Sequence, residues 1–282
     1  MLPVLLDIKF LKIYTFGIFL VLAFFWSCYF LWKNISLTSY KEEDVFDVLF
    51  TALVGGLFFG RLIYVILNFD KFGFDLLKFI LINGYPGISF FGLVIGILVC
   101  LLLGFPSKKI KFTEIIDYFI APFFLALAIG KLGSFLAGVD IGTKTNFFLK
   151  IRYVGFDGLR NLTALYESIF FLLGFALANK LLMDLRKGKI GKGFLFYFFC
   201  WSFSLIGFVF DGLKEKHLYL AGQNFNWYAY AILLLTFSLY FIYYFRTLFL
   251  AKLKSIINFF NLWQHKLPKH YPKNLKKDSR KS

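Results

Sequence analysis

The chain has 282 residues, of which 59% are hydrophobic and 17% charged, and its mean hydropathy of +0.71 lies outside the range of soluble domains. The formal net charge of +16 would suggest a nucleic-acid partner in a soluble protein. Here the basic residues fall in loops between apolar runs and in the C-terminal tail, a pattern that sets membrane orientation and gives no reason to expect nucleic acid.

Long apolar stretches recur along the chain, and a helix needs about 20 such residues to cross a bilayer. They predict an all-α integral membrane protein with seven transmembrane helices. A membrane domain over residues 1–254 is followed by a basic cytoplasmic tail over 255–282. The predicted spans are Ile13–Trp32, Phe46–Leu67, Gly87–Leu103, Ile115–Ala137, Ala164–Met183, Gly193–Asp211 and Trp227–Phe249.

The loops give the predicted orientation, because short cytoplasmic loops carry an excess of Lys and Arg. The third-to-fourth connection contains Lys108, Lys109 and Lys111, and the fifth-to-sixth contains Arg186, Lys187, Lys189 and Lys192. We therefore expect both on the cytoplasmic side, together with the C-terminal tail. An odd number of spans then places the N-terminus outside.

The loop from Asn68 to Pro86 mixes Phe and Leu residues with Lys71 and Lys78. It predicts a short amphipathic segment in the outer interface, with a partly buried structural helix as the alternative.

Several polar residues interrupt or end the apolar spans. With the N-terminus outside, all of them lie toward the outer half of the membrane. Ionisable groups at membrane depth are costly and tend to mark substrate pathways. Clustered bases there suit a phosphate, so the pattern indicates a phospholipid headgroup. The residues are Arg61, Tyr64, Lys131, Ser134, Arg160, Asn161, Tyr166, Glu167, Asp211, Lys214 and Glu215; Asn161 could cap the fifth span.

Four motifs resemble those of the prolipoprotein diacylglyceryl transferase family. Gly130 to Gly142, which reads GKLGSFLAGVDIG, is similar to the family signature GRxGNFxNxExxG and to a variant, GRxGCFxAGCCYG. Gly60 to Val65 is similar to GRxxYV, and Gly87 to Gly96 is similar to GGxSFHGGxxG. Arg160 to Glu167, which reads RNLTALYE, is similar to RHP[ST]QLYE.

The resemblance implies a multi-pass enzyme of the bacterial inner membrane. It would transfer diacylglycerol from phosphatidylglycerol to the lipobox cysteine at the signal peptide of a prolipoprotein, without metal or cofactor. The thiol would attack the glycerol carbon that bears the phosphate, so the site must stabilise a departing phosphate. On this basis Lys131, Asp140 and Arg160 are the predicted catalytic residues. The predicted substrate-binding residues are Arg61, Tyr64, Gly133, Ser134, Tyr166, Glu167, Asp211 and Lys214.

The chain departs from the family pattern at five positions: Phe91 replaces a His, Lys131 an Arg, Ser134 an Asn, Val139 a Glu and Gly207 an Arg. The general base is left open between a carboxylate such as Asp140 and His217. One alternative is therefore a catalytically impaired relative that binds phospholipid or lipoprotein without turnover. A second is a transporter or channel, but the inner halves of the spans carry few polar residues, and no paired repeat with broken helices is evident.

Overall fold

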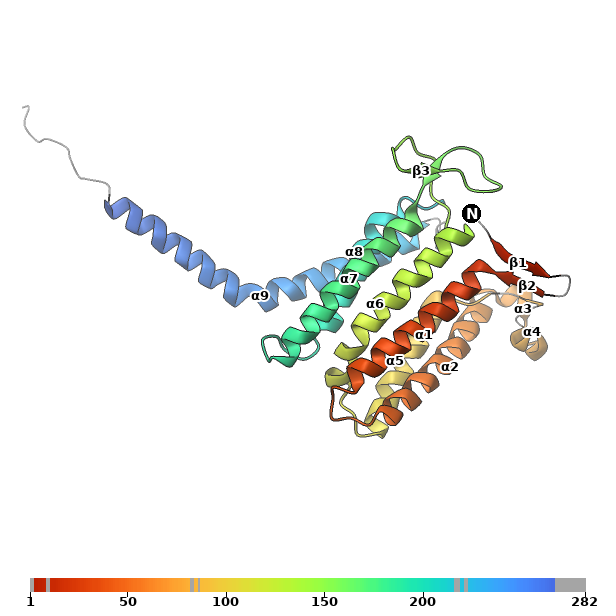
Figure 1. The fold of residues 1–282 in the computed structure, drawn as a ribbon, viewed down its shortest axis with the longest axis horizontal. Helices are drawn as coiled ribbons and strands as arrows, with labels where there is room; N and C mark the ends of the chain where they lie inside the picture. Colours follow the sequence, from red (N-terminus) through yellow and green to blue (C-terminus); the bar gives the residue numbers. More distant parts are fainter. Residues whose placement is uncertain are drawn as a thin grey trace, which may run out of the picture. The chain divides into compact units, whose positions relative to one another are not determined.

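The computed structural model describes residues 3–8, 11–81, 84–85, 87–215, 219–220 and 223–266. Helices dominate this part of the chain. The long helices are α1 (Thr15–Ile35), α2 (Glu42–Leu67), α5 (Phe90–Ser107), α6 (Phe112–Ala137), α7 (Thr163–Arg186), α8 (Phe194–Asp211) and α9 (Phe225–Lys266), with α3 (Phe69–Phe72) and α4 (Leu76–Ile80) as short helices (Figure 1). The described residues also form three two-stranded antiparallel pairs, of which the first precedes α1 and the others lie between α6 and α7 and between α8 and α9. They are β1 (Val4–Ile8) with β2 (Leu11–Tyr14), β3 (Lys150–Ile151) with β4 (Arg160–Asn161), and β5 (Tyr219–Leu220) with β6 (Gln223–Asn224).

Each predicted span corresponds to one long helix. Six of these helices are long and apolar enough to cross a bilayer, including the Asn226–Arg246 part of α9. The apolar part of α5, Gly92–Ser107, is shorter than this criterion requires. The described residues thus form a helical protein with six candidate spans and one shorter apolar helix. Many exposed side chains of the long helices, such as Phe25 and Leu67, are apolar, as expected of side chains that face lipid.

Two groups of helices make up most of the packing: α2 lies against α5, and α6 lies between α1 and α7. The backbones of α2 and α5 approach closely where both helices carry glycine. A Cβ at Gly96 would lie 3.0 Å from the Gly55 carbonyl oxygen, and one at Gly92 would lie 2.8 Å from that of Phe59. Small residues at such crossings are the usual means of packing helices in membranes. A buried cluster that includes Ile35, Val45 and Phe105 joins α1, α2 and α5.

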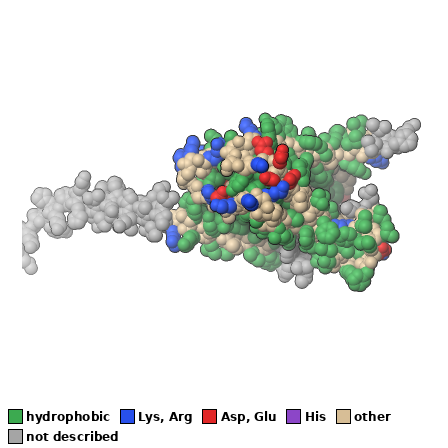
Figure 2. Space-filling model, turned by 90° about the horizontal axis from the view of Figure 1, so that it is seen from below, with side chains coloured by type: hydrophobic (Ala, Val, Ile, Leu, Met, Phe, Trp, Pro, Cys, Tyr) green, Lys and Arg blue, Asp and Glu red, His purple; other side chains and the backbone are tan. Residues whose placement is uncertain are grey.

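The loops after α1, α5 and α7 meet at one end of the helices. Lys108 lies 3.0 Å from Asp44 and 3.1 Å from Asp47, and Lys192 lies 2.8 Å from Glu114. Figure 2, seen from below, shows a mixed patch of basic and acidic side chains within a mostly hydrophobic surface. The two Lys-rich loops therefore share one end of the molecule, near the start of α6.

The same end contains a buried helix cap. The carboxylate of Asp117 on α6 is fully buried and accepts hydrogen bonds from the backbone N–H groups of Gly193 (2.6 Å) and Phe196 (3.1 Å). These are donors that the first turn of α8 cannot satisfy internally. The negative charge also complements the positive end of the helix dipole, which fixes α8 against α6.

At the opposite end, the predicted amphipathic segment folds as α3 and α4. Phe74, Leu76 and Leu77 are 98%, 70% and 69% exposed, whereas Phe72 is buried. This exposure matches an amphipathic segment better than the alternative of a partly buried structural helix.

The chain divides into two compact units, Met1–Leu234 and Leu235–Ser282, and the division falls within α9. The predicted boundary between membrane domain and tail, after residue 254, also lies inside this helix. Residues 267–282 of the predicted tail lie outside the described part of the chain.

Candidate phosphate-binding site

The end of α6 turns back toward the helix. Gly138 has φ +70°, the left-handed conformation that ends many helices, and its N–H and that of Val139 bond to the carbonyls of Phe135 and Ser134. This turn directs Asp140 back to Lys131, and the carboxylate accepts a 2.8 Å hydrogen bond from Nζ. Lys131 and Asp140, the basic and acidic residues of the Gly130 to Gly142 motif, thus form an ion pair that depends on a glycine turn.

Glu167 on α7 joins two lysines. Its Oε2 lies 2.6 Å from Nζ of Lys131, and its Oε1 lies 2.6 Å from Nζ of Lys214. The Glu167 side chain is only 3% exposed, whereas Lys131 and Lys214 are 26% and 17% exposed. One buried carboxylate therefore positions two partly accessible ammonium groups from α6 and from the segment after α8.

Backbone pairing brings Lys214 to this place. The segment after α6 bonds to the segment after α8 through Thr143 N–H to the Leu213 carbonyl (2.9 Å) and Glu215 N–H to the Ile141 carbonyl (3.0 Å). Gly142 pairs directly with Lys214. A Cβ at Gly142 would lie 2.2 Å from the Asn161 carbonyl oxygen, so the close approach of these segments requires glycine.

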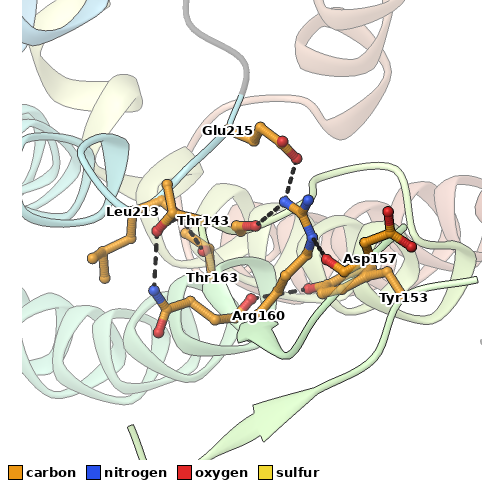
Figure 3. A network of polar contacts seen from close by, with 9 residues as sticks. Thr143, Tyr153, Asp157, Arg160, Thr163, Leu213 and Glu215 are labelled. Atoms are coloured by element: carbon orange, nitrogen blue, oxygen red, sulfur yellow. Dashed lines mark hydrogen bonds and ion pairs between the residues drawn. The ribbon is translucent and has the colours of Figure 1, made fainter. Parts of the chain in front are cut away.

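Arg160 on β4 lies beside the paired segments that follow α6 and α8 (Figure 3). Its guanidinium donates to the Gly142 carbonyl (3.1 Å) and the Asp157 carbonyl (3.3 Å) and forms an ion pair with Glu215. The ring of Phe156 lies 5.2 Å from the guanidinium carbon, within cation–π range. Arg160 is only 4% exposed, and its contacts hold the loops together.

The start of α7 differs from the expected capping. Asn161 belongs to β4, and its side-chain N–H donates to the Thr143 hydroxyl at 3.2 Å instead of accepting from the helix. The helix begins at Thr163, whose hydroxyl donates to the Leu213 carbonyl at 3.1 Å. The prediction that Asn161 caps the fifth span is therefore wrong, because its side chain is used to join the loops.

Tyr153 adds a buried phenol beneath these loops. Its hydroxyl donates to the Asn161 carbonyl at 3.2 Å, and burial, with a smaller effect from Asp140, raises its pKa to about 12. Sequence reasoning missed this residue, because nothing distinguishes it from the other tyrosines of the chain.

The ion pairs of the site balance in charge. The three bases Lys131, Arg160 and Lys214 face the three carboxylates Asp140, Glu167 and Glu215. Burial raises the pKa of Asp140, but attraction to Lys131 and, less strongly, to Lys214 outweighs it, so the pKa lies below its ordinary value. The site therefore contains both bases and ionised carboxylates, and an anion that enters must share the bases with these carboxylates.

Two further predicted residues lie on the same turns of α6. The Ser134 hydroxyl is buried beside Asp140 but has no hydrogen bond of regular geometry to any described residue. Gly133 faces α1, where a Cβ would lie 2.3 Å from Cβ of Phe19. Gly133 thus permits close helix packing, whereas Ser134 offers an unused donor and acceptor.

Arg61 and Tyr64 lie outside this ion-pair network. Arg61 is 3% exposed and donates to the backbone carbonyls of Phe79 (2.9 Å), Gly87 (2.8 Å) and Lys78 (2.7 Å). The Tyr64 ring packs on Gly87, where a Cβ would lie 2.1 Å from the ring. Among the described contacts, both residues hold the 78–87 segment against α2, and their substrate-binding role stays a prediction.

The remaining predicted residues surround the network. Tyr166 donates to the Leu149 carbonyl at 3.1 Å and packs on Phe210 with ring centroids 6.0 Å apart. Asp211, 1% exposed, ends α8 close to Lys214. The side chain of Phe91, which replaces the family His, lies outside the described residues, as does the whole of His217, which was weighed for the general base.

Comparison with known proteins places the chain in a family. The family model described as prolipoprotein diacylglyceryl transferase matches residues 3–264. A phosphatidylglycerol–prolipoprotein diacylglyceryl transferase of Clostridium tetani is 29% identical over 203 residues, which cover 69% of this chain and 79% of the relative. Proteins of the same name from Listeria welshimeri and Finegoldia magna are 26% and 27% identical, over 77% and 67% of this chain and 80% and 73% of their own lengths. The chain therefore belongs to the prolipoprotein diacylglyceryl transferase family.

Proposed function

We propose that the protein transfers diacylglycerol from phosphatidylglycerol to the cysteine thiol of a prolipoprotein lipobox. The observation that carries the proposal is that Glu167 brings Lys131 and Lys214 within 2.6 Å of its two oxygens. Two ammonium groups at the end of apolar helices suit the phosphate of a membrane lipid, whose acyl chains would lie along the helices. Membership of the family supports the same substrate.

In the proposed reaction the thiol sulfur attacks the glycerol carbon that bears the phosphate. A C–S bond forms, the C–O bond breaks, and glycerol phosphate leaves with the bonding electron pair. Lys131 and Lys214 stabilise the charge that develops on the phosphate, with Arg160 as a third base. Asp140 is ionised and, at 30% side-chain exposure, accessible, so it is our candidate to accept the thiol proton.

The other residues contribute to binding in this proposal. The polar surroundings of the two lysines are assigned to Ser134, Tyr166, Glu167 and Asp211. Gly133 allows α6 to pack closely at this point. Arg61 and Tyr64, which contact Lys78, Phe79 and Gly87 after α2, are proposed to bind substrate as well.

The proposed orientation has seven spans, an outer N-terminus and a cytoplasmic tail in the bacterial inner membrane. Two Lys-rich loops, which contain Lys108 and Lys192, lie near the start of α6, whereas the candidate site lies at the end of the same helix. This separation supports the orientation, because it puts the Lys-rich loops and the site on opposite sides of the membrane. With about 1.5 Å per residue, Glu114 and Lys131 on α6 are about 25 Å apart along the helix, close to the thickness of a hydrocarbon core.

Complementation tests this proposal in cells. The gene is expressed in a bacterium depleted of its own transferase, and we expect growth and lipoprotein maturation to be restored. Lys131→Ala should not restore them, whereas the matched control Lys33→Ala, which removes an exposed lysine of α1, should. Failure of the wild-type protein, although it folds and reaches the membrane, would contradict the proposal.

One observation favours a second candidate function, lipid binding without turnover: each base of the site is already paired with a carboxylate. The substitution of an expected Arg by Lys131 also removes a bidentate donor. This candidate predicts phosphatidylglycerol binding by the purified protein together with failed complementation.

A further inference from the structure

The two lysines of the candidate site are matched by carboxylates. Nζ of Lys131 lies 2.8 Å from Asp140 and 2.6 Å from Glu167, and Nζ of Lys214 lies 2.6 Å from the other oxygen of Glu167. A further acidic residue, Asp211, is 1% exposed and ends α8 three residues before Lys214. These side chains of α6, α7, α8 and the adjoining segments therefore have no surplus of positive charge.

Arg160 does not change this balance, because Glu215 forms an ion pair with it. A phosphate that enters the site accepts charge-assisted hydrogen bonds from the two ammonium groups but is repelled by the carboxylates that hold them. Where attraction and repulsion balance, a second negative charge on the phosphate gains no net attraction. It does raise the cost of removing the phosphate from water, because that cost grows with the square of the charge. The site should therefore hold a phosphate with one charge more tightly than one with two.

The proposed reaction changes the charge of the phosphate. Phosphatidylglycerol is a phosphate diester with one negative charge. When the C–O bond breaks, the oxygen keeps the bonding pair, so the glycerol phosphate that leaves is a monoester with about two negative charges. The thiol proton passes to Asp140 in this reaction, and the site then carries one positive charge more until Asp140 releases the proton to water. The carboxylates thus oppose the product more strongly than the substrate once Asp140 is ionised again.

We propose that Asp140 and Glu167 make the site selective for phosphate diesters with one negative charge and promote the departure of the doubly charged monoester product. The inference rests on the proposed function, because it assigns a specificity to the same phosphate site. The lysines bind the phosphate, and the carboxylates that pair with them set which charge state of the phosphate is bound most tightly.

Three lipids with the same acyl chains test this selectivity in the full-length protein in detergent micelles near pH 8. Phosphatidylglycerol and phosphatidylmethanol are diesters with one charge, and phosphatidic acid is a monoester with about two. Phosphatidylmethanol lacks the second glycerol, so it separates the effect of charge from recognition of the headgroup. We expect both diesters to bind the wild type about tenfold more tightly than phosphatidic acid, the effect of one charge about 6 Å away at an effective dielectric constant of about 40. Phosphatidic acid that binds as tightly as phosphatidylmethanol would overturn the inference.

Asp140→Asn removes one carboxylate charge and resembles the protonated residue. We expect the preference for phosphatidylmethanol over phosphatidic acid to fall by about tenfold in this variant. The matched control is Asp184→Asn, because the Asp184 side chain is also 30% exposed and pairs with one lysine, Lys189, at 3.4 Å. Asp184 lies about 25 Å along α7 from Glu167, so its variant should keep the wild-type preference. An unchanged preference in Asp140→Asn, or an equal change in both variants, would contradict the assignment.

Binding and turnover separate this inference from the proposed function. If the wild type shows no turnover, the proposed function fails, and the ranking of the three lipids still decides the selectivity. Asp140→Asn loses an ion pair, so its unfolding temperature is measured first; if it does not fold, the wild-type ranking alone decides. Folded wild-type protein that binds none of the three lipids would overturn the inference together with the phosphate site.

Discussion

Glu167→Gln removes one buried negative charge and keeps the shape of the side chain. In the native structure this carboxylate lies 2.6 Å from both Lys131 and Lys214 and is 3% exposed. Without it, two ammonium groups face each other across an amide that offers one acceptor oxygen. We therefore expect the variant to fold with a much weaker connection between α6, α7 and the segment after α8.

The magnitude follows from the geometry. Nitrogens bound to the two oxygens of one carboxylate lie about 6 Å apart, and at an effective dielectric constant of about 20 they repel by about 3 kcal/mol. Removing one partner of a buried ion pair costs a similar amount, about 3–5 kcal/mol. A loss of about 3 kcal/mol corresponds to an unfolding temperature lowered by about 5–10 °C in a domain of this size.

Tryptophan fluorescence of the detergent-solubilised protein measures this shift. Glu43→Gln, which changes an exposed carboxylate in the first turn of α2, is the matched control and should unfold like the wild type. In a double-mutant cycle, Lys131→Met should cost much less in the Glu167→Gln background than alone, because the repulsion is removed with the lysine. If Glu167→Gln unfolds at the temperature of the wild type, Glu167 does not hold the two lysines together as the distances indicate.

Three further predictions concern the surroundings of the site. Arg61→Lys should speed hydrogen–deuterium exchange in residues 78–87, since one ammonium cannot satisfy the three carbonyls that the guanidinium contacts; exchange equal to wild type would show that these contacts do not hold the segment. Gly142→Ala should lower both stability and activity, because its Cβ would lie 2.2 Å from the Asn161 oxygen, whereas Gly212→Ala, with nothing within 4 Å, should be neutral; equal unfolding temperatures would contradict this. Because the pKa of Asp140 is depressed in the folded protein, its contribution is present above the unfolded-state pKa and is lost as pH falls through the folded-state value. Asp140→Asn should therefore be less stable than wild type near neutral pH and equal to it in strong acid, as followed by urea unfolding at each pH; a constant difference at all pH values would argue against the ion pair.

Much of the helical framework is predictable from the sequence. Apolar runs of about 20 residues define the long helices, because the hydrophobic requirement of a membrane leaves few alternatives. The helices extend beyond the predicted spans at several ends, for example to Ile35 in α1 and from Glu42 in α2, since polar residues outside the hydrocarbon can still continue a helix.

The sequence predicts that several of these polar residues lie near one another, but it does not predict their contacts. The meeting of Lys131, Glu167 and Lys214 agrees with the expected common depth of these residues. That the bases pair with carboxylates depends on the left-handed turn at Gly138 and on backbone pairing at Gly142, which spacing alone does not define. The contacts of Arg61 are likewise not predictable from the sequence, because a buried guanidinium bonds to whichever carbonyls the fold brings near.

No pattern in the sequence predicts where Tyr230 of α9 packs. Its position depends on the missing side chain at Gly207, a residue of another helix. In a chain with 16 tyrosines, such a pairing becomes visible only in three dimensions.

The most direct measurement is the product of the reaction. Purified protein is incubated with phosphatidylglycerol and a lipobox peptide, and mass spectrometry follows the peptide. We expect a peptide heavier by one diacylglyceryl group in thioether linkage to its cysteine, with glycerol phosphate released in equal amount, and no such product from Lys131→Ala. Folded wild-type protein that binds phosphatidylglycerol but leaves the peptide unmodified would contradict the proposed transferase activity.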